Sequence, residues 1–476
     1  MDLHQGSKGA WSTLARERYT IHAGREARRG RNKRILAIEG NETLVVLDSK
    51  DDITAGDGAK HEIIRGKGEL ATRTTCNVFQ LLKDSGLPVA YRERISKTAF
   101  VAPHCKMLPY EMVARRESHG SHQHRCPHIP LGTVFPRLKT EVFAKTSGLK
   151  WRDRLIPMDD PLLEFTDSEV LFLLPHWTKE QKAESAKTGF RGYLVGQQPF
   201  LRVPKDQFFT VKDEEELLQR MRKLLVRAFF VIEKAWQLPG RKAVDIKIEF
   251  GLGAPTAEEP TGQLFIADVI DNDSWRVVQG DSYICKQSFR DDGDINDVTR
   301  NYQLVADLTD RFAIHKQRII IWTGSASDNT EVFAANLRKV FGVTDGMSFP
   351  GLQPTVFHVR SLHKEPVKGI MELHRLIQEV PDCVVIDYIG RSNGAGPTIS
   401  ANCTVPVINV PVGTESERVR NVWSSLELPS NVPASTIMEP ANAVLAALQV
   451  LAARNPCLYA ILRQQQEERF TNVVAC

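Results

Sequence analysis

The sequence lacks the features that mark membrane and secreted proteins. It contains no run of about eighteen apolar residues, so we expect no segment to span a membrane. Its first residues, MDLHQG, lack the apolar core of a secretory signal peptide. The 8 cysteines are irregularly spaced and form no CxxC pair, which is typical of reduced cytosolic thiols. We therefore expect a cytoplasmic protein.

The sequence also has little net charge. A formal net charge of +4 gives no reason to expect nucleic acid as a partner. Basic residues gather in residues 16–34, where they indicate either a solvated terminus or, at the end of the run, a phosphate site. We divide the run accordingly, with an N-terminal extension over residues 1–28 and a site beyond it.

The sequence does have length and an ordinary globular composition. Its 476 residues are 42% hydrophobic and 25% charged. A chain of this length is too long for a single hydrophobic core, so it predicts two domains.

The first half shows the patterns of hairpins and long helices. Two β-rich runs, 35–38 and 43–48, are joined by Glu-Gly-Asn-Glu, which predicts a β-hairpin. Helical spacing over residues 71–83 and 214–237 predicts two amphipathic helices.

Two further strands and an irregular region complete this half. Residues 243–250 and 264–270 are β-rich and predict neighbouring strands. Residues 146–215 are polar, contain 5 prolines and indicate surface insertions around a core. The first half therefore predicts an α+β domain with antiparallel hairpins.

The pattern changes near residue 317. Short apolar strands are predicted over residues 318–322, 384–389 and 405–412, with helices over 330–340 and 441–453. This alternation indicates an α/β domain with a doubly wound parallel sheet, in which ligands bind at the carboxyl ends of the strands.

The two halves give the expected domain boundaries. We place the first domain at residues 29–298 and the second at 317–476. Residues 299–316 look mostly helical and are predicted to form a linker helix.

Candidate anion-binding residues stand at two turns of the first half. Gly30 and Lys33 precede the predicted hairpin, where backbone N–H groups and an ammonium could cover phosphates. Arg115 lies upstream of the Gly120-Ser121 turn, an arrangement that suits a phosphate or carboxylate. For Gly30 and Lys33 by themselves a basic surface turn is the better interpretation, and for Arg115 the alternative is a salt-bridged surface.

Alternating carboxylates give the strongest local signal. Asp245, Lys247 and Glu249 share one face of the predicted strand, because side chains alternate along a strand. The next strand is followed by Asp268 and further acidic residues. Two acidic strands could hold Mg²⁺, which prefers a few carboxylates plus substrate phosphates. The alternative is the charged outer face of a sheet.

A cluster of histidines raises the question of zinc. The cluster consists of His119, His122, His124 and His128 with Cys126. Its close, irregular spacing matches no common zinc pattern, which favours a loop role.

Residues 29–298 resemble phosphoribosylaminoimidazole-succinocarboxamide synthetase. The resemblance is carried by SKDDITAGDGAK (49–60), RGK (65–67), TAFVAPHCKMLPYEMVARR (98–116), HGS (119–121), VDIKIEFG (244–251) and LFIADVIDNDSWR (264–276). It implies an ATP-grasp-like α+β fold. It also implies an enzyme that uses ATP and Mg²⁺ to phosphorylate a substrate carboxylate, after which the amine of aspartate attacks the acyl phosphate.

The same resemblance implies roles for individual residues. Lys33 would contact ATP phosphates, and Glu249 and Asp268 would bind Mg²⁺. Arg115 and Ser121 would hold the substrate. The remaining implied residues are Gly30, Lys50, Met107 and Glu111 for ATP, and Asp245, Lys247 and Arg276 for substrate.

This half also departs from the family in a few places. Arg31 and Arg34 stand where the family has a lysine and an acidic residue. An insertion around residues 146–160 separates Lys145 from Asp159-Asp160-Pro161. The family has a shorter connection there.

Glycine-rich loops of the second half carry a second set of candidates. GSASD (324–328) and GRSNGAGP (390–397) offer backbone N–H groups and hydroxyls to a phosphate. His363, within SLHK (361–364), is a candidate for proton transfer because imidazole titrates near neutrality.

Residues 317–454 resemble the phosphoribosylaminoimidazole carboxylase domain that is fused to the synthetase in animals. The motifs are GSASD, SLHK, GRSNGAGP and VWSSLELPS (422–430). The resemblance implies direct addition of CO₂ to the imidazole carbon without biotin or ATP. The implied partners are nucleotide substrates, L-aspartate, CO₂ and further copies of the chain in a homo-octamer.

The resemblance again implies roles for residues. His363 and Lys364 would assist proton transfer, with Ser392 grouped among the catalytic residues. Ser325 and Asp328 would bind the ribose-phosphate. The CO₂ pocket would be lined by Ser392, Asn393 and Gly394.

Larger side chains stand where the carboxylase family has small ones. Asp387-Tyr388-Ile389 precede the GRSNG motif, and Leu362 precedes His363. If they occupied the space needed for CO₂ and a flat ring, they would exclude both. The alternative to a bifunctional enzyme of purine biosynthesis is therefore a diverged paralogue with one or both activities lost, acting as an oligomeric binding or scaffold protein.

Overall fold

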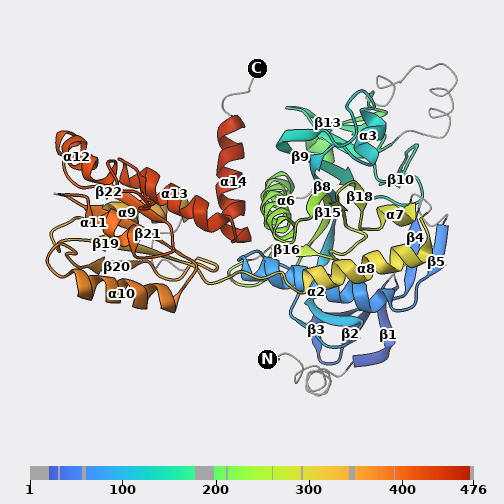
Figure 1. Cartoon of the computed structure of the whole chain (residues 1–476). Coiled ribbons are helices and arrows are strands. Elements are labelled where there is room, and N and C mark those ends of the chain that lie inside the picture. The colour runs from blue at the N-terminus through green and yellow to red at the C-terminus, as the bar shows by residue number, and fades with distance from the viewer. Residues whose placement is uncertain are drawn as a thin grey trace. The chain divides into compact units, whose positions relative to one another are not determined.

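The chain folds into two compact units (Figure 1). A computed structural model describes residues 21–29, 33–55, 60–176, 198–210, 213–259, 261–290, 293–341, 349–390 and 392–471. The first unit comprises Met1–Phe312 with Glu467–Cys476, and the second comprises Ala313–Gln466. Among the described residues, no helix combines the length and apolar character that a bilayer crossing requires.

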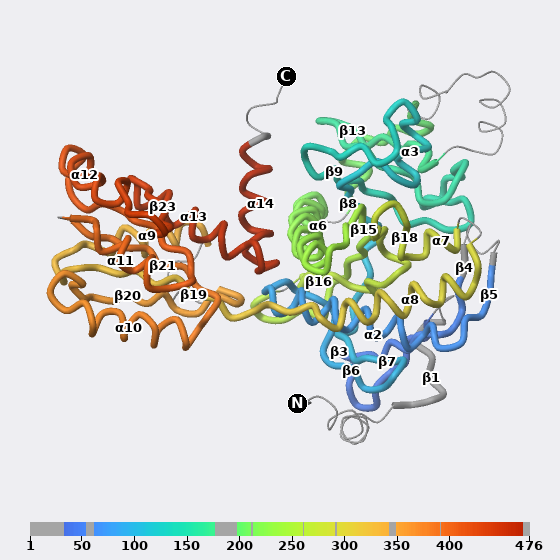
Figure 2. The backbone as a smooth tube through the Cα atoms, viewed as in Figure 1, coloured from blue at the N-terminus to red at the C-terminus, as the bar shows by residue number. Residues whose placement is uncertain are grey.

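The first unit begins with a five-stranded antiparallel sheet. The predicted hairpin is present, as Lys33–Ile38 pairs with Asn41–Ser49 around a turn at Gly40, whose φ is +69°. The sheet order is β1 (Ile21–Arg29), β2 (Lys33–Ile38), β3 (Asn41–Ser49), β7 (Ala99–Pro103) and β6 (Glu93–Arg94). A separate two-stranded ribbon, visible in Figure 2, pairs β4 (Asp52–Ala55) with β5 (Lys60–Ile63).

A nine-stranded antiparallel sheet forms the centre of the first unit. The predicted pairing of the strands near 243–250 and 264–270 is confirmed, with Glu249 opposite Ala267. The order is β14 (Leu201–Pro204), β13 (Glu169–Leu173), β12 (Leu162–Phe165), β9 (Val134–Ala144), β8 (Lys106–Glu117), β15 (Lys242–Leu252), β17 (Trp275–Gln279) and β18 (Ser282–Tyr283), with β16 (Leu264–Ala267) also paired to β15.

The interpretation of residues 146–215 as surface insertions is wrong for much of the segment that the structure describes. Strands β12, β13 and β14 extend the central sheet through this region. Their apolar residues, including Val170, Phe172 and Val203, are buried. Prolines at the strand ends disguised three short strands, since each strand is only 4 or 5 residues long. Residues 177–197 lie outside the described residues.

Helices pack against the two sheets. The predicted helix over 214–237 is confirmed at the same bounds, and it lies against β15 and β8. Helix α2 begins where the Asp51 carboxylate accepts hydrogen bonds from the amides of Gly66 (3.1 Å) and Gly68 (2.9 Å). The helices are α2 (Lys67–Asp84), α3 (Ser121–Arg125), α5 (Lys205–Phe208), α6 (Glu214–Gln237), α7 (Gln287–Arg290) and α8 (Ile295–Thr309).

The predicted linker helix over 299–316 differs from the structure. Most of that stretch lies in α8, which packs against α2 as part of the first unit. Arg73 of α2 pairs with Asp307 and Asp310 at the end of α8, and buried Tyr302 faces the first unit's interior. The predicted second domain also runs past Gln466, whereas the residues from Glu467 group with the first unit.

The second unit is a doubly wound parallel sheet, as predicted. All its strands are parallel, in the order β20 (Val356–Val359), β19 (Arg318–Thr323), β21 (Cys383–Ile389), β22 (Val407–Pro411) and β23 (Ser435–Thr436). Strand β20 was not predicted because it is a short edge strand whose side chains remain partly exposed. The helices are α9 (Glu331–Phe341), α10 (Pro366–Glu379), α11 (Ala395–Ala401), α12 (Glu415–Asn421), the 3₁₀ turn η3 (Val422–Ser425), α13 (Pro440–Ala452) and α14 (Pro456–Thr471).

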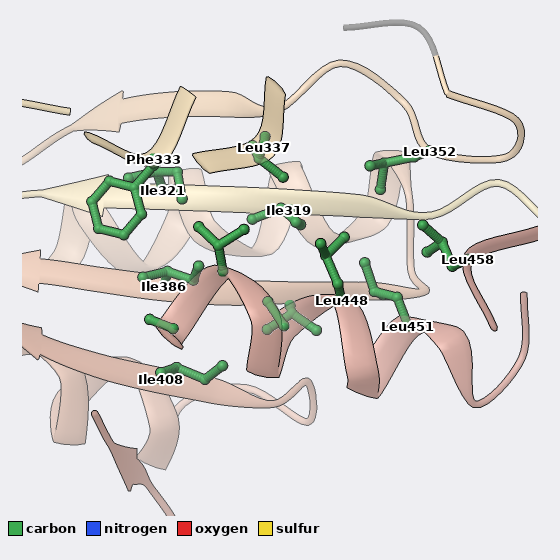
Figure 3. Packing of buried hydrophobic residues seen from close by; sticks show 14 of the residues in the cluster. Ile319, Ile321, Phe333, Leu337, Leu352, Ile386, Ile408, Leu448, Leu451 and Leu458 are labelled. Carbon is green, nitrogen blue, oxygen red and sulfur yellow. The ribbon is translucent and has the colours of Figure 1, made fainter. Parts of the chain in front are cut away.

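Both faces of this sheet are covered by helices. On one face, Leu448 and Leu451 of α13 pack with Phe333 of α9 against Ile319 and other strand residues (Figure 3). On the other face, residues of α10 and α11 cover side chains such as Trp322 and Val385. Because helices cover both faces of the sheet, a ligand can reach it only at the ends of the strands, where the loops lie.

Candidate active sites

Two adjoining cavities mark the candidate site of the first unit. Their volumes are about 690 and 280 Å³. Both are lined by Glu111 of β8 and by Lys247 of β15. The Lys247 ammonium donates to the Glu111 carboxylate at 2.8 Å. The two residues lie diagonally across the paired strands β15 and β8. The central sheet therefore supplies the floor of the site.

The predicted shared face of β15 is confirmed. Asp245 and Lys247 line the smaller cavity, while Lys247 and Glu249 line the larger one. Glu249 forms an ion pair with Lys145, which follows β9. Burial raises the pKa of Glu249, but the ammonium groups of Lys145, Lys247 and Lys33 outweigh that effect and hold the pKa below its usual value. Glu249 is therefore an anion at neutral pH.

Lys33 and Asp268 meet in the larger cavity and form an ion pair there. Burial lowers the pKa of the Lys33 ammonium to about 8, against the opposing effect of Glu249 and Asp271. Asp268 has a φ of +65°, a left-handed conformation that a non-glycine residue adopts at a cost of about 1–3 kcal/mol.

The carboxylates of this cavity suit a magnesium ion. Glu249 and Asp268 line the same cavity, and both have hard oxygen donors. Within the described residues, no group of three or more His, Cys, Asp or Glu side chains is placed to hold a metal by itself. Mg²⁺ commonly takes only one or two carboxylates together with substrate phosphates. The donor set therefore fits an ion shared with a phosphate ligand.

The smaller cavity is built around two arginines and one carboxylate. Asp245 accepts hydrogen bonds from Arg115 (2.6 Å) and Arg276 (2.7 Å). Arg115 also donates to Glu141 (2.8 Å) and to the Ser121 hydroxyl (3.0 Å). Arg115 is only 3% exposed, so most of its donors are engaged within the protein. Arg276 and Ser121 line the same cavity.

Gly120 touches this arginine pair, and its substitution gives a stability prediction. A Cβ at Gly120, whose φ is +57°, would lie 2.1 Å from Arg276 Nη2. We expect Gly120→Ala to lower the free energy of unfolding by about 3 kcal/mol or more, because strain and displacement of Arg276 add together. Chemical denaturation measures this change.

Gly132 provides the matched control for that prediction. Its φ is +77°, but nothing lies within 4 Å of an added Cβ. Gly132→Ala therefore carries the left-handed strain alone, about 1–2 kcal/mol. Equal losses in the two variants would show that the contact with Arg276 does not matter.

Sequence reasoning missed a second charged group in the larger cavity. Asp273 binds Lys286 at 3.0 Å, lies 3.7 Å from Lys67 and accepts from the Tyr302 hydroxyl at 2.5 Å. Burial raises the pKa of Asp273, but Lys67 and Lys286 outweigh it, so the pKa lies below its usual value. The signal was available in the RGK and DVIDNDSWR stretches, but no role was assigned to these positions.

The ends of the insertion around residues 146–160 line the larger cavity. It forms a hairpin of β10 (Lys150–Trp151) and β11 (Arg154–Leu155). At its base Thr146 is bonded to Asp159 (2.9 Å) and to Asp160 (2.9 Å). The extra residues thus project as a loop, while its two ends return to the cavity wall.

Other predicted residues of this half lie elsewhere. Lys50 is placed 3.9 Å from Asp52, and neither Lys50 nor Met107 lines the two cavities. Met107 is 38% exposed and lies against Gly251. Gly30 falls outside the described residues.

The histidine cluster has a structural role where its contacts are defined. His119 bonds to the Tyr283 hydroxyl (2.6 Å) and to Glu117 (3.2 Å). His122 bonds to the Ser118 hydroxyl at 2.9 Å. These contacts support the predicted loop role.

The candidate site of the second unit lies at the carboxyl edge of its sheet. Successive strands β19 and β20 are neighbours, and the chain then crosses to β21 on the other side of β19. This reversal is a topological switch point, where ligands bind in doubly wound sheets. The GSASD and GRSNGAGP loops follow β19 and β21, so they flank that point.

The predicted residues fall in these loops. In GSASD, the Asp328 carboxylate accepts a hydrogen bond from the Ser325 amide at 3.1 Å and closes the loop. His363 and Lys364 follow β20 in an exposed turn. The Ser392 backbone is left-handed, with a φ of +52°. Buried Asn393 donates to the Ser425 hydroxyl at 3.2 Å, which ties the loop to η3.

The larger apolar side chains near the motifs pack in the two cores of the second unit. Leu362 is 4% exposed and packs in the core beneath α10, where it meets Gly369. Tyr388 packs edge-on against Phe333 with ring centroids 4.9 Å apart. Ile389 lies in the same core as Leu362. Strand alternation turns Tyr388 and Ile389 of β21 into opposite cores, and Leu362, in the turn after β20, packs with Ile389.

Comparison with known proteins assigns both units to families. Residues 26–172 and 202–307 match the SAICAR synthetase family. Residues 318–471 match the AIR carboxylase family. The chain belongs to these two families. SAICAR synthetase is the phosphoribosylaminoimidazole-succinocarboxamide synthetase that the first half resembles.

Animal proteins with both domains match nearly the whole chain. The probable multifunctional protein ADE2 of Caenorhabditis elegans is 34% identical over 454 residues, 93% of this chain and 94% of that protein. The bifunctional phosphoribosylaminoimidazole carboxylase/phosphoribosylaminoimidazole succinocarboxamide synthetase of Rattus norvegicus is 31% identical over 456 residues, 93% of each chain. A solved SAICAR synthase structure from Ehrlichia chaffeensis is 21% identical, with a TM-score of 0.45 over 60% of this chain and 98% of that one.

Proposed function

We propose that the chain catalyses two reactions of purine nucleotide synthesis. The second unit adds CO₂ to an aminoimidazole ribonucleotide. The first unit then joins the new carboxylate to the amine of L-aspartate, using ATP. The observation that carries the proposal is the pair of cavities in the first unit, where lysines, arginines and carboxylates converge. The Caenorhabditis relative, aligned along almost all of the chain, supports the pairing of activities.

In the first unit, the larger cavity is the proposed site for ATP and Mg²⁺. Glu249 and Asp268 would hold the ion, and Lys33 would bind phosphate oxygens. ATP supplies the phosphoryl group that activates the substrate carboxylate. Glu111 orients Lys247 through the 2.8 Å ion pair, at the junction of the two cavities.

The smaller cavity is the proposed site for the imidazole nucleotide. Arg276 and Ser121 line it and would bind the anionic substrate. Arg115 is a positioning residue here, because its guanidinium holds Asp245 and the Ser121 hydroxyl. Asp245 in turn orients Arg276.

In the second unit, the loops at the switch point are the proposed carboxylase site. Ser325 and Asp328 would bind the ribose-phosphate, and Ser392, Asn393 and Gly394 would form the CO₂ pocket. His363 and Lys364 would move the proton released from the imidazole carbon. The imidazole carbon is itself the nucleophile, so this step requires neither biotin nor ATP.

We further propose that the chain works in the cytoplasm as a homo-octamer. This rests on the likeness of both domains to the animal bifunctional proteins. Sedimentation of the purified full chain tests the oligomeric state, for which an eightfold mass is expected.

Two assays on the purified full chain test the proposed function. One follows consumption of the carboxylated imidazole nucleotide in the presence of ATP, Mg²⁺ and aspartate. The other follows CO₂-dependent conversion of the aminoimidazole nucleotide by absorbance. Activity in both is expected. Silence in both, with either nucleotide at saturating concentration, would overturn the enzyme assignment and leave the scaffold alternative.

The pKa of Lys33 gives a pH prediction for nucleotide binding. Below about pH 8 Lys33 is an ammonium, and above it the free site loses that charge. Bound phosphate stabilises the ammonium, so binding above this pH takes up a proton. We expect the affinity for a non-hydrolysable ATP analogue to fall by up to about tenfold per pH unit above pH 8. Titration calorimetry across pH 7–10 measures it.

Lys33→Arg is the control for that prediction. A guanidinium keeps its charge over this range, so the affinity should then be nearly independent of pH. The same fall in both proteins would mean that a group other than Lys33 titrates.

A further inference from the structure

Asp387 is a buried carboxyl group that the proposed reactions do not use. It lies near the end of β21, is 0% exposed, and has no hydrogen-bond partner for either carboxyl oxygen. Asn409, its register neighbour on β22, is equally buried and unpartnered at both amide atoms. Two adjacent buried polar groups without partners are rare in folded proteins and require an explanation.

Gly396 brings the two groups together. A Cβ at Gly396 would lie 1.6 Å from Asn409 Oδ1 and 2.7 Å from Asp387 Oδ2. Both oxygens thus lie close to one point on the first turn of α11. No side chain larger than hydrogen fits there, and the backbone packs directly on the two polar groups.

This contact lies directly below the loop proposed to hold CO₂. The loop residues Ser392 to Gly394 lie between β21, which carries Asp387, and α11, which carries Gly396. On its other side, Asn393 ties the loop to Ser425. The position of α11 therefore helps to determine where the loop stands.

We propose that Asp387 is a neutral carboxylic acid that pairs with the amide of Asn409, and that this pair is a positioning element for the Ser392–Gly394 loop. A protonated carboxyl group donates one hydrogen bond and accepts another, so it matches an amide. The acid proton would lie between Asp387 Oδ2 and Asn409 Oδ1, the two oxygens that come together at Gly396. Its role in positioning the loop for carboxylation rests on the proposed function.

The charges around Asp387 favour the neutral form. It lies beside an apolar core. Trp322 is its register neighbour on β19, and Val385 lies two residues before it on the same face of β21. Burial raises the pKa of Asp387 well above its usual value, and the Asp328 carboxylate raises it further. The backbone N–H of Gly396 lowers the pKa of Asp387, but burial and the Asp328 carboxylate outweigh it. Within the described residues, no cation pairs with this carboxyl group.

Substitutions separate a neutral pair from a catalytic anion. Asp387→Asn keeps shape and hydrogen bonding, so its carboxylation rate should stay within about twofold of the wild type. Asp387→Ala and Asn409→Ala each leave the other residue's polar group without its partner. Each should lower the carboxylation rate by about 100-fold through misplacement of the loop. The double alanine variant removes both polar groups, so neither is left without a partner. Its carboxylation rate should be about tenfold higher than that of either single variant.

The outcome that contradicts the proposal is clear. If Asp387→Asn were as inactive as Asp387→Ala, an ionised carboxylate would be required and the neutral pair would be refuted. Additive losses in the double variant would show that the two residues do not interact. Asp382→Asn is the matched control, since Asp382 lies at the opposite end of β21 and accepts from Gln317 at 2.9 Å. It should leave the rate unchanged.

A second measurement does not depend on catalysis. The infrared spectrum of the full chain at pH 7 should contain a carboxylic acid C=O band that disappears in Asp387→Asn and persists in Asp382→Asn. Its absence from the wild type would overturn the neutral acid. If the wild-type chain failed to carboxylate at all, the proposed function would fail, while the infrared band and the double-mutant cycle on unfolding would still decide the pairing.

Discussion

Glu249→Gln is expected to lower the synthetase rate by at least about 100-fold while leaving the carboxylase rate unchanged. Glutamine keeps the size of the side chain but removes the negative charge that faces Lys145 and would bind Mg²⁺. The lost charge weakens metal binding and leaves Lys145 without its ion-pair partner. The measurement is ATP- and aspartate-dependent turnover at saturating substrate, with the carboxylase rate of the same preparation as internal reference.

The Mg²⁺ requirement sharpens this prediction. Glu249→Gln should need a higher Mg²⁺ concentration for half-maximal rate, because one of two carboxylate ligands is lost. Glu259→Gln is the matched control, since the Glu259 side chain is 44% exposed and its ion-pair contact with Arg220 is long, at 4.0 Å. A normal synthetase rate and a normal Mg²⁺ dependence in Glu249→Gln would show that Glu249 does not bind the metal ion.

His363→Ala is expected to lower the carboxylase rate by about 10²–10⁴-fold, with the synthetase rate unchanged. His363 stands in the turn after β20, at the edge of the sheet where the loops gather. Its side chain is exposed, so its loss should not disturb the core and the fold should remain intact. The carboxylation assay measures the loss, and thermal unfolding of the same variant checks the fold.

A second exposed histidine of the same unit supplies the control. His374 of α10 bonds to the carbonyl of Asn402 at 2.7 Å, away from the strand ends. His374→Ala should keep the full carboxylase rate. Equal rates for His363→Ala and wild type would exclude His363 from the proton transfer and turn attention to Lys364.

The sequence predicted well where one segment carries its own pattern. The helix at Glu214–Gln237 was placed at its observed bounds because its apolar residues recur at the helical period over many turns. The shared face of Asp245, Lys247 and Glu249 followed from strand alternation alone. The motif loops identified both families because those residues lie close together in the chain.

Contacts between distant segments could not be predicted from the sequence, because no local pattern indicates them. Asp273 and Lys67 are far apart in the chain and meet only in the folded first unit. The hairpin insertion carries no local sign that its two ends meet, yet Thr146 closes its base through Asp159 and Asp160. Likewise, no local pattern showed that the large side chains of Leu362 and Tyr388 pack in the cores of the second unit.

The sequence by itself therefore determined the two families, the order of the domains and most of the charged residues of both sites, because short motifs and periodic strands record them locally. Only the tertiary structure decided which charges pair, that Leu362 and Tyr388 pack in the cores, and that Asp387 faces Asn409 under Gly396. The physical reason is that pairing and burial depend on distances between segments, which the order of residues along one segment does not contain.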